Sequence, residues 1–391
     1  MNVAELPHVS GELLDLDELA AVRAQSWIAR SDRGFEVLTY DRGFEVLEHP
    51  QLLKGPTFQY RIDELGLTGD ARRYMQMSVP NTEGEYRKRL RQPLTSLFRP
   101  SQIAKLREGI RDIARTAVAE LDHDGPVDLM ERLCWIVPSQ TYCDLVSIPR
   151  EFGPTIKSIG DRILGVLLTV DKDRVHELEA AVAESVEIVK EHLEKRRQNL
   201  GDDFTSVMIQ QQEAGMLTEE ELFVEAFSIL QASVDNTAHQ MGNTFALLLR
   251  EPERWRAFVE NRDLRGPIIE EAIRLYPRFG TVFRLAPNDV TIGDVDIPGG
   301  SWIFVSVRAA QRDPAQFEAP DEYRLDRKNS RKPMFGSGGY NCLGQNLARM
   351  EIEEALMAVA DAYPEIRLAG DWVRRETNAV SETKQLPVTL R

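Results

Sequence analysis

Cys342 lies in a glycine-rich segment that could hold a sulfur atom in a fixed position. Residues 335–344 read Phe-Gly-Ser-Gly-Gly-Tyr-Asn-Cys-Leu-Gly. Glycines let the backbone come close enough for peptide N–H groups to donate to a thiolate. A helix predicted from about Leu343 adds positive potential beside the sulfur. These features suit a thiolate ligand to iron.

The alternative is a glycine-rich turn with an incidental buried cysteine. A phosphate loop is disfavoured because neither GxxxxGK[ST] nor GxGxxG occurs here.

The same segment resembles the cysteine-ligand loop of cytochromes P450. That loop has Phe-Gly-x-Gly, an arginine or histidine two residues before the cysteine, and then Gly and Ala-Arg. The residues that match are Phe335, Gly336, Gly338, Cys342, Gly344, Ala348 and Arg349. Tyr340 takes the place of the family's cation, which binds a haem propionate. A tyrosine can donate a hydrogen bond there without a charge. The resemblance implies haem b, with Cys342 as its axial ligand.

Haem carries two anionic propionates, and three arginines occupy places where the family binds them. Arg87 and Arg91 are one helical turn apart and resemble the family's His/Arg pair, with Arg87 in place of the histidine. Arg284, in Phe-Arg-Leu-Ala, resembles a third propionate ligand. The alternative for residues 87–91 is a solvated basic helix face.

Glu271 and Arg274 resemble the E-x-x-R motif of the family. A Glu and an Arg at i and i+3 share a helix face and can form a buried ion pair. Arg327 occupies the place of the arginine that completes this network in the family. The implied role of the three residues is structural.

Asp235 and Asn236 occupy the places of an acid and an alcohol that manage protons in the family. The family usually has Ala/Gly-Gly-x-Asp/Glu-Thr-Thr, whereas residues 232–237 read Ala-Ser-Val-Asp-Asn-Thr. An amide can hydrogen-bond a water or a substrate oxygen, but it relays protons less well than a hydroxyl. We therefore expect Asn236 to position a water or a substrate oxygen. The alternative is a polar pair that faces solvent.

Helical periodicity places several of these side chains on one face, which the resemblance turns toward the haem. Strand turns are expected to complete the substrate pocket. The predicted pocket residues are Ser228, Gln231, Ala232, Asn236, Gly280, Val282, Ala379 and Val380. Polar Gln231 and Asn236 indicate a substrate with at least one oxygen atom.

The elements that must position these residues are mostly helices. Residues 84–250 are predicted to be mainly helical, and Thr218 with Glu221 forms a capping box that opens a helix to about Leu249. Short strands follow over 281–307, with a hairpin at 291–300. A loop over 310–334 precedes the helix after Cys342. The predicted fold class is mostly α (α+β), a single P450-type domain over 1–391 with a long central helix and small sheets.

One heptapeptide occurs twice near the start of the chain. Asp-Arg-Gly-Phe-Glu-Val-Leu is found at 32–38 and again at 41–47. The first copy reads as a strand, and the second reads as a short helix with Asp41 as its cap. Tertiary context would then decide the structure of each copy.

Charge and cysteine content exclude some classes of protein. The net charge is −15, from 48 basic and 63 acidic residues, which argues against a nucleic-acid binder. The first residues lack the features of a signal peptide, and no stretch is apolar enough to span a membrane. We expect a cytoplasmic monomer. Cys134 and Cys143 are expected to be buried, without a disulfide framework.

The resemblance implies a monooxygenase that hydroxylates a small organic substrate with dioxygen. A terpenoid or another secondary-metabolite intermediate is the expected substrate class. No flavin or iron–sulfur segment is present, so a separate ferredoxin or flavodoxin would supply electrons. A basic patch of Lys328, Arg331, Lys332 and Arg349 would suit an acidic donor, although scattered surface charge explains these residues equally well. A peroxide-driven or oxidative-coupling enzyme and a non-catalytic haem sensor are the alternatives.

Overall fold

Helices predominate in the computed structural model, which describes residues 3–11, 13–54, 59–121 and 125–390. The contacts among these residues form two units, and each unit combines segments that are distant in the sequence. The first unit lies within residues 1–55, 243–342 and 372–384, and the second lies within 56–242, 343–371 and 385–391. The mostly helical fold class is confirmed, and the single domain stays a prediction.

The first unit is built on a five-stranded sheet with the order β1-β2-β3-β8-β5. β1 with β2 and β3 with β8 are parallel pairs, whereas β2 with β3 and β5 with β8 are antiparallel. The strands of this unit are β1 (His8–Val9), β2 (Ile28–Ser31), β3 (Gly34–Val37), β5 (Thr281–Leu285), β6 (Val290–Ile292), β7 (Val295–Ile297), β8 (Trp302–Ser306), β10 (Val373–Glu376) and β11 (Ser381–Gln385). The predicted hairpin is confirmed as the β6–β7 pair.

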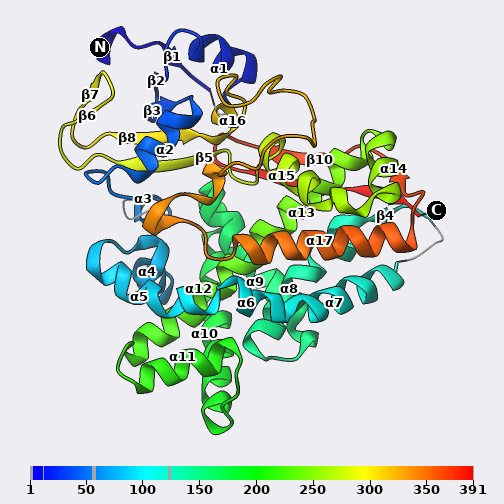
Figure 1. The fold of residues 1–391 in the computed structure, drawn as a ribbon. Helices are drawn as coiled ribbons and strands as arrows, with labels where there is room; N and C mark the ends of the chain where they lie inside the picture. The colour runs from blue at the N-terminus through cyan, green and yellow to red at the C-terminus, as the bar shows by residue number, and fades with distance from the viewer. Residues whose placement is uncertain (1–2, 12, 55–58, 122–124, 391) are drawn as a thin grey trace. The chain divides into compact units, whose positions relative to one another are not determined.

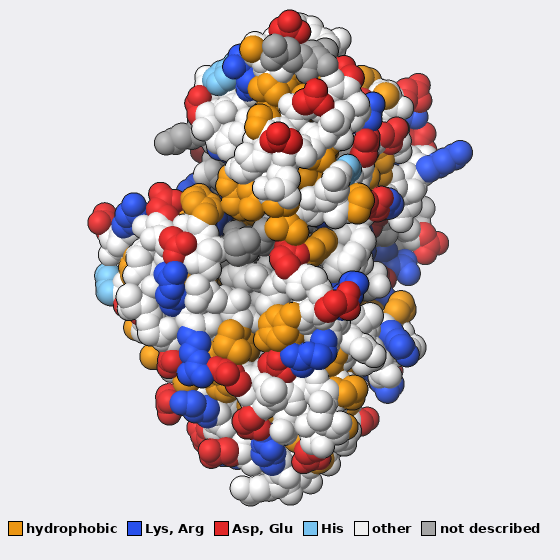
Figure 2. Space-filling view, turned by 90° about the vertical axis from the view of Figure 1, so that its left-hand side faces the viewer, with side chains coloured by type: hydrophobic (Ala, Val, Ile, Leu, Met, Phe, Trp, Pro, Cys, Tyr) orange, Lys and Arg blue, Asp and Glu red, His pale blue; other side chains and the backbone are white. Residues whose placement is uncertain are grey.

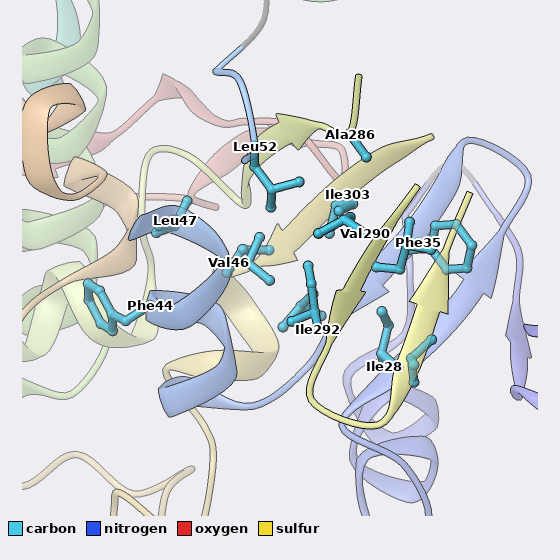
Figure 3. Packing of buried hydrophobic residues seen from close by; sticks show 14 of the residues in the cluster. Ile28, Phe35, Phe44, Val46, Leu47, Leu52, Ala286, Val290, Ile292 and Ile303 are labelled. Carbon is cyan, nitrogen blue, oxygen red and sulfur yellow. The ribbon is translucent and has the colours of Figure 1, made fainter. Parts of the chain in front are cut away.

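Buried apolar side chains join this sheet to the helices that pack on it. Figure 3 shows Val46 and Leu47 of α2 and Ile303 of β8 with Val290 and Ile292 of the hairpin in one cluster. The helices of the first unit are α1 (Leu16–Arg23), α2 (Tyr40–Glu48), α14 (Pro252–Glu260), α15 (Arg265–Leu275) and α16 (Val307–Ala310). Burial of this apolar surface is the main force that holds the sheet and α2 together.

The repeated heptapeptide takes two structures, as predicted. Its first copy contains β3, which pairs with β2 and β8, and its second copy lies within α2. The predicted cap is wrong, because α2 begins at Tyr40 with Thr39 at the N-cap position. Asp41 lies in the first turn, where an acidic side chain still favours a helix N-terminus.

The second unit is mainly helical, which confirms the prediction for 84–250. In Figure 1, α7 and α17 lie side by side, and Arg107 and Arg111 pair with Glu354 across them. A three-stranded sheet of order β4-β12-β9 completes this unit. Its larger elements are α3 (Gln59–Glu64), α4 (Gly69–Met77), α5 (Gly84–Leu97), α6 (Pro100–Ile103), α7 (Arg107–Ala119), β4 (Val127–Asp128), α8 (Ile136–Val146), α9 (Gly153–Thr169), α10 (Val175–Gln198), α11 (Phe204–Glu213), α12 (Glu219–Ser233), α17 (Gln345–Ala362), β9 (Arg367–Leu368) and β12 (Pro387–Thr389).

The predicted helix from 218 to 249 is wrong in one respect, because it is two helices. α12 opens with the capping box of Thr218 and Glu221, as predicted, and α13 covers Asp235–Leu249. Val234 separates them with φ −101° and ψ −65°. The Ser233 hydroxyl donates to the Ile229 carbonyl, a contact that tends to bend helices. Asp235 then opens a new helix N-terminus, where a carboxylate is favourable.

Across the part of the chain that the structure describes, no helix combines the length and the apolar character that a bilayer crossing requires.

Candidate functional site

The loop that carries Cys342 is shaped by one glycine and one backbone hydrogen bond. Gly336 has φ +70° and ψ −164°, a conformation that is almost restricted to glycine. A Cβ at this position would lie 2.8 Å from the Tyr340 carbonyl oxygen. The Cys342 N–H donates to the Phe335 carbonyl at 2.7 Å, which closes the loop. Cys342 is exposed, in contrast to Cys134 and Cys143, which are buried as predicted.

Arg284 and Tyr340 meet in the first unit beside this loop. Arg284 comes from β5, is buried, and donates to the Leu47 carbonyl at 2.6 Å and to the Phe283 carbonyl at 2.9 Å. Its guanidinium lies over the Tyr340 ring, 5.1 Å from the centroid. The aromatic ring therefore contacts a cation at the place where the family has a cationic side chain. Together the two residues give this side of the loop the positive charge that Tyr340 alone lacks.

Two members of the predicted basic patch are engaged within the first unit. Lys332 is buried, and its ammonium lies 3.1 Å from Glu270 Oε2. Arg331 pairs with Glu48 and lies over the Phe44 ring. On the face shown in Figure 2, acidic and basic side chains are interspersed. The predicted basic patch is therefore wrong for Lys332, because the buried pair with Glu270 neutralises its charge.

Glu271, Arg274 and Arg327 lie together in the first unit. Arg274 Nε is 2.7 Å from Glu271 Oε2, and Arg327 Nε is 3.2 Å from Glu271 Oε1. Arg274 also donates to the carbonyls of Gln311 and Glu322 at 3.0 and 2.9 Å. The arginines lower the pKa of Glu271 against the opposing effect of its burial. This network joins α15 to the loop that precedes the cysteine segment.

The predicted pocket residues of the first unit are adjacent. The Gly280 N–H donates to the Ala379 carbonyl at 2.9 Å, and Phe279 pairs with Val380 in an antiparallel bridge. A Cβ at Gly280 would lie 2.7 Å from the Asn378 carbonyl, so the close approach of these segments requires a glycine. Val282 follows in β5 and is half-buried. The structure thus brings residues 280–282 and 379–380 into one region of this unit.

Arg87 and Arg91 lie on α5 of the second unit. Arg87 is buried, and its guanidinium donates to the Val79 carbonyl. Arg91 is half-buried on the next turn. The solvated-face alternative therefore does not describe Arg87. In the same unit, Gly344 immediately precedes α17, and α17 begins three residues after Cys342.

One face of α12 and α13 is less covered than the rest of these helices. Ala232 is exposed, and Ser228, Gln231 and Asn236 are half-buried. Asn236 Oδ1 and Gln231 Nε2 are buried atoms with no hydrogen-bond partner among the described residues. Buried polar atoms in proteins are nearly always hydrogen-bonded. These atoms are therefore positioned to bind a polar group that the chain itself does not supply.

Asp235 contacts a histidine that the sequence interpretation did not single out. His239 Nε2 lies 3.3 Å from Asp235 Oδ1, and both side chains are buried. The His239 ring packs edge-on against Trp135, with centroids 5.2 Å apart. The i, i+4 spacing of an acid and a histidine on one helix was the available signal. His239 thus restricts the position of the Asp235 carboxylate.

Glu351 is a second residue that the sequence interpretation missed. It lies on α17, is buried, and accepts a hydrogen bond from the Thr237 hydroxyl of α13. Burial raises the pKa of Glu351 well above its usual value. Its Oε2 has no hydrogen-bond partner among the described residues. An acidic residue inside an amphipathic helix pattern normally faces solvent, so no sequence pattern indicated this burial.

Each unit, taken by itself, carries side chains of the kind that a thiolate-ligated haem uses. The first unit supplies an exposed cysteine in a fixed loop and a buried arginine beside it. The second unit supplies the α5 arginines and a helix face with unsatisfied polar atoms. A thiolate ligand, cations for carboxylates and polar groups for a substrate are the parts that haem oxygenation chemistry requires.

The family model of cytochrome P450 matches residues 158–363. The chain belongs to the cytochrome P450 family. Luteothin monooxygenase of Streptomyces thioluteus is 28% identical to it over 378 residues, which are 96% of this chain and 92% of that protein. Mycinamicin IV hydroxylase/epoxidase of Micromonospora griseorubida is 30% identical over 284 residues, which are 72% of this P450 and 70% of that protein.

Solved structures agree with the fold. Epothilone B-bound cytochrome P450epoK superimposes with a TM-score of 0.88 at 22% identity, and the match covers 96% of both chains. CxnD, a cytochrome P450 for C–S bond formation in chuangxinmycin biosynthesis, gives a TM-score of 0.85 at 25% identity over 96% of this P450 and 93% of that chain. The fold is therefore the P450 fold. With relatives that are monooxygenases and hydroxylases, this P450 is a haem-dependent monooxygenase.

Proposed function

We propose that this P450 binds haem b and hydroxylates a small organic substrate of secondary metabolism. Cys342 would ligate the iron, with Phe335, Gly336 and Gly344 shaping the loop around it. Arg87, Arg91 and Arg284 would bind the propionates, and Tyr340 would donate one hydrogen bond to them. Glu271, Arg274 and Arg327 would hold the cysteine segment in place without touching the substrate. When bound, the haem supplies the oxidising power that inserts one oxygen atom of dioxygen into the substrate.

The exposure of Cys342 is the observation that supports this proposal most directly. Cysteine is usually buried, and the other two cysteines of the chain are. Cys342 is instead presented by a loop whose conformation depends on Gly336 and on the hydrogen bond to Phe335. A structural cysteine needs neither feature, whereas a metal ligand needs both access and a fixed direction.

Asp235 and Asn236 would manage protons and solvent at the reacting oxygen. The Asp235 carboxylate contacts His239 and can accept or return a proton. The Asn236 amide can donate to a water or a substrate oxygen and accept through its unsatisfied Oδ1. The substrate would lie along Ser228, Gln231 and Ala232. Gly280, Val282, Ala379 and Val380 would line the remainder of the pocket.

Several features beyond the chemistry belong to the same proposal. Electrons would come from a separate ferredoxin or flavodoxin, and the protein would work as a cytoplasmic monomer. Arg331 and Lys332 are engaged with Glu48 and Glu270, so docking of an acidic donor would rely on other cations. A terpenoid is one substrate class that an apolar pocket with a few polar groups would accept.

The absorption spectrum of the reduced protein with carbon monoxide tests the proposal. We expect the strongly red-shifted Soret band of a thiolate ligand in the wild type and its loss in Cys342→Ala. Cys143→Ala is the matched control, since it removes a buried thiol from the second unit, and it should retain the band. The absence of the band in the wild type would contradict the proposal.

Turnover with an accepted substrate tests the role of Asn236. We expect Asn236→Ala to lower the fraction of electrons that end in product, because water near the oxygen is no longer ordered. Gln210→Ala, which removes an exposed amide from α11 of the same unit, is the control. Unchanged rate, coupling and substrate affinity in Asn236→Ala would exclude this role. A wild type that turns over equally well with hydrogen peroxide alone would favour the peroxide-driven alternative.

A further inference from the structure

Glu225 is a buried carboxyl group in α12 that neither the family match nor the proposed reaction explains. Its side chain is 1% exposed, and neither carboxyl oxygen has a hydrogen-bond partner among the described residues. A buried carboxyl without partners is costly whether it is ionised or neutral. A side chain that persists in such a position therefore calls for a ligand or another functional explanation.

Glu221, on the preceding turn of the same helix, is a carboxylate that has hydrogen-bond partners within the chain. Glu221 forms a two-bond ion pair with Arg89, with one N–O distance of 2.8 Å, and accepts from the Thr218 N–H at 2.8 Å. These bonds lower the pKa of Glu221 to about 2. Burial raises the pKa of Glu225 to about 8, although Arg87 opposes this shift. The fold thus provides partners for Glu221 and, among the described residues, provides no hydrogen-bond donor for Glu225, which could therefore accept one from a bound molecule.

Glu225 lies on the face of α12 that the chain leaves least covered. At 3.6 residues per turn, positions 225, 228 and 232 of α12 fall within one quarter of the helix circumference. Ser228 and Asn236 are half-buried and Ala232 is exposed. Glu225 therefore forms the N-terminal end of the row that contains Ser228 and Ala232.

We propose that Glu225 binds a cationic nitrogen of the substrate, such as a tertiary or quaternary ammonium group. A carboxylate with two unused oxygens is the side chain best suited to compensate a buried positive charge. An uncharged hydroxyl or carbonyl would be served by the amides of Gln231 and Asn236 and would not need an acid. The proposal rests on the proposed function, since it names the substrate class of that reaction.

The helix also sets the distance between the cation and the reacting atom. Between Glu225 and Asn236 lie about 12 Å of α12, from Glu225 to Ser233, and then the break at Val234. A substrate that reaches both residues must be elongated, with its nitrogen near one end. Oxidation is then expected far from the nitrogen, and the nitrogen acts as an anchor without reacting.

Titration calorimetry of the wild-type holoprotein tests the site without turnover. The probes are dodecyltrimethylammonium, which is cationic and has no lone pair for iron, and dodecyldimethylamine N-oxide, which is uncharged above pH 6. We expect the cation to bind about tenfold more tightly or better at pH 9. The preference should shrink toward pH 6, because the carboxyl is then protonated. Besides Glu225, the titratable groups in its surroundings are Arg87 and Tyr86 of α5 and Glu221.

Proton release supplies a second readout. Binding of the cation at pH 7 should ionise Glu225 and release about one proton, seen as different heats in phosphate and Tris buffers. Glu225→Gln should lose both the proton release and the preference for the cation. Glu225→Asp should retain part of the preference, and Glu220→Gln, an exposed acid of the same helix, should retain all of it.

The outcomes separate this proposal from the proposed function. Equal affinity of the wild type for both probes, without proton release, would overturn the ammonium site even if no variant folds. A thiolate-type carbon monoxide band together with that result leaves the monooxygenase proposal intact. A cation preference that survives in folded Glu225→Gln would also overturn the assignment.

Discussion

The cysteine segment of the first unit and the α12–α13 face of the second unit differ in whether their polar groups find partners within the chain. Around Cys342 the chain satisfies itself: Gly336 sets the turn, the Cys342 N–H has its acceptor, and Arg284 lies over Tyr340. On α12 and α13, buried oxygen or nitrogen atoms of Glu225, Gln231 and Asn236 have no partner among the described residues. In the first region, contacts within the chain fix the loop, whereas the second region leaves these atoms without a partner from the described chain.

This difference separates two tasks. A ligand loop must hold its geometry whatever substrate is bound, so its hydrogen bonds are internal. A recognition face gains selectivity when the substrate supplies the missing partners, because a molecule without them leaves buried groups unpaired. Changes to the first region should therefore affect the folded protein, and changes to the second should affect pH dependence and selectivity.

The largest effect is expected where the network behind the cysteine segment is broken. Glu271→Ala leaves the buried Arg274 and the half-buried Arg327 without this carboxylate. We expect a loss of about 3–5 kcal/mol in the free energy of unfolding. Urea denaturation measures it. Glu318→Ala removes an exposed partner of Arg324 and should cost less than about 1 kcal/mol. Equal losses in the two variants would mean that the buried network contributes no more to the free energy of unfolding than an exposed ion pair.

A pair of glycines tests the loop itself. Gly336→Ala places a Cβ 2.8 Å from the Tyr340 carbonyl in a conformation that disfavours side chains, and we expect a loss of about 3 kcal/mol and of the thiolate-type band. Gly338 also has a positive φ, of +58°, but a Cβ there would meet nothing within 4 Å. Gly338→Ala should cost about 1 kcal/mol and keep the band. Thermal unfolding with the carbon monoxide spectrum distinguishes the two.

The second region should make the stability of the protein depend on pH, through Glu225. The pKa of Glu225 is raised from 4.5 to about 8 in the folded protein, so the folded state binds the proton more tightly than the unfolded chain. The stability from this group is fully present below about pH 4.5 and is lost as pH rises through about 8. Relative to Glu225→Gln, the wild type should lose up to about 1.4 kcal/mol per pH unit over this window.

Denaturation midpoints at pH 5, 6.5 and 8 check this expectation. Glu351 contributes equally to the pH dependence of both proteins, so its effect is absent from the difference between them. Parallel pH profiles for the wild type and Glu225→Gln would contradict a raised pKa at Glu225.

The smallest effect is expected at His239, a positioning residue for Asp235. His239→Gln should lower the coupling of electrons to product on the order of tenfold and alter its pH profile, since the carboxylate is less constrained. Stability should change little if the Gln side chain fills the space of the imidazole beside Trp135. His192→Gln replaces another histidine of the second unit and should leave coupling unchanged. A pH profile of coupling in His239→Gln that equals that of the wild type would show that His239 has no role in proton transfer.

The sequence was most informative where function demands particular residue types in a short segment. The Cys342 loop, the capping box at Thr218 and the spacing of Glu271 and Arg274 were all visible without a structure. Each depends on local geometry, in which a glycine conformation, a helix start or one helical turn fixes the neighbours.

What the sequence did not predict depends on burial and tertiary contact. Lys332 was predicted to be a surface cation but is buried against Glu270, and Glu225, which no sequence pattern singled out, is 1% exposed. The break at Val234 arises from one hydroxyl bond to Ile229 and the new N-terminus at Asp235. A charged residue looks the same in a sequence whether solvent or a neighbouring helix surrounds it, so these features required the fold.

The small sheet of the second unit places a constraint on biosynthesis. Its central strand is β12 (Pro387–Thr389), which pairs with β4 (Val127–Asp128) on one side and with β9 (Arg367–Leu368) on the other. On the ribosome, β4 emerges long before its partner exists. The second unit therefore cannot reach its final form while translation is in progress at residue 380, and a ribosome that stalls there would leave an edge of β4 open to chaperones or proteases.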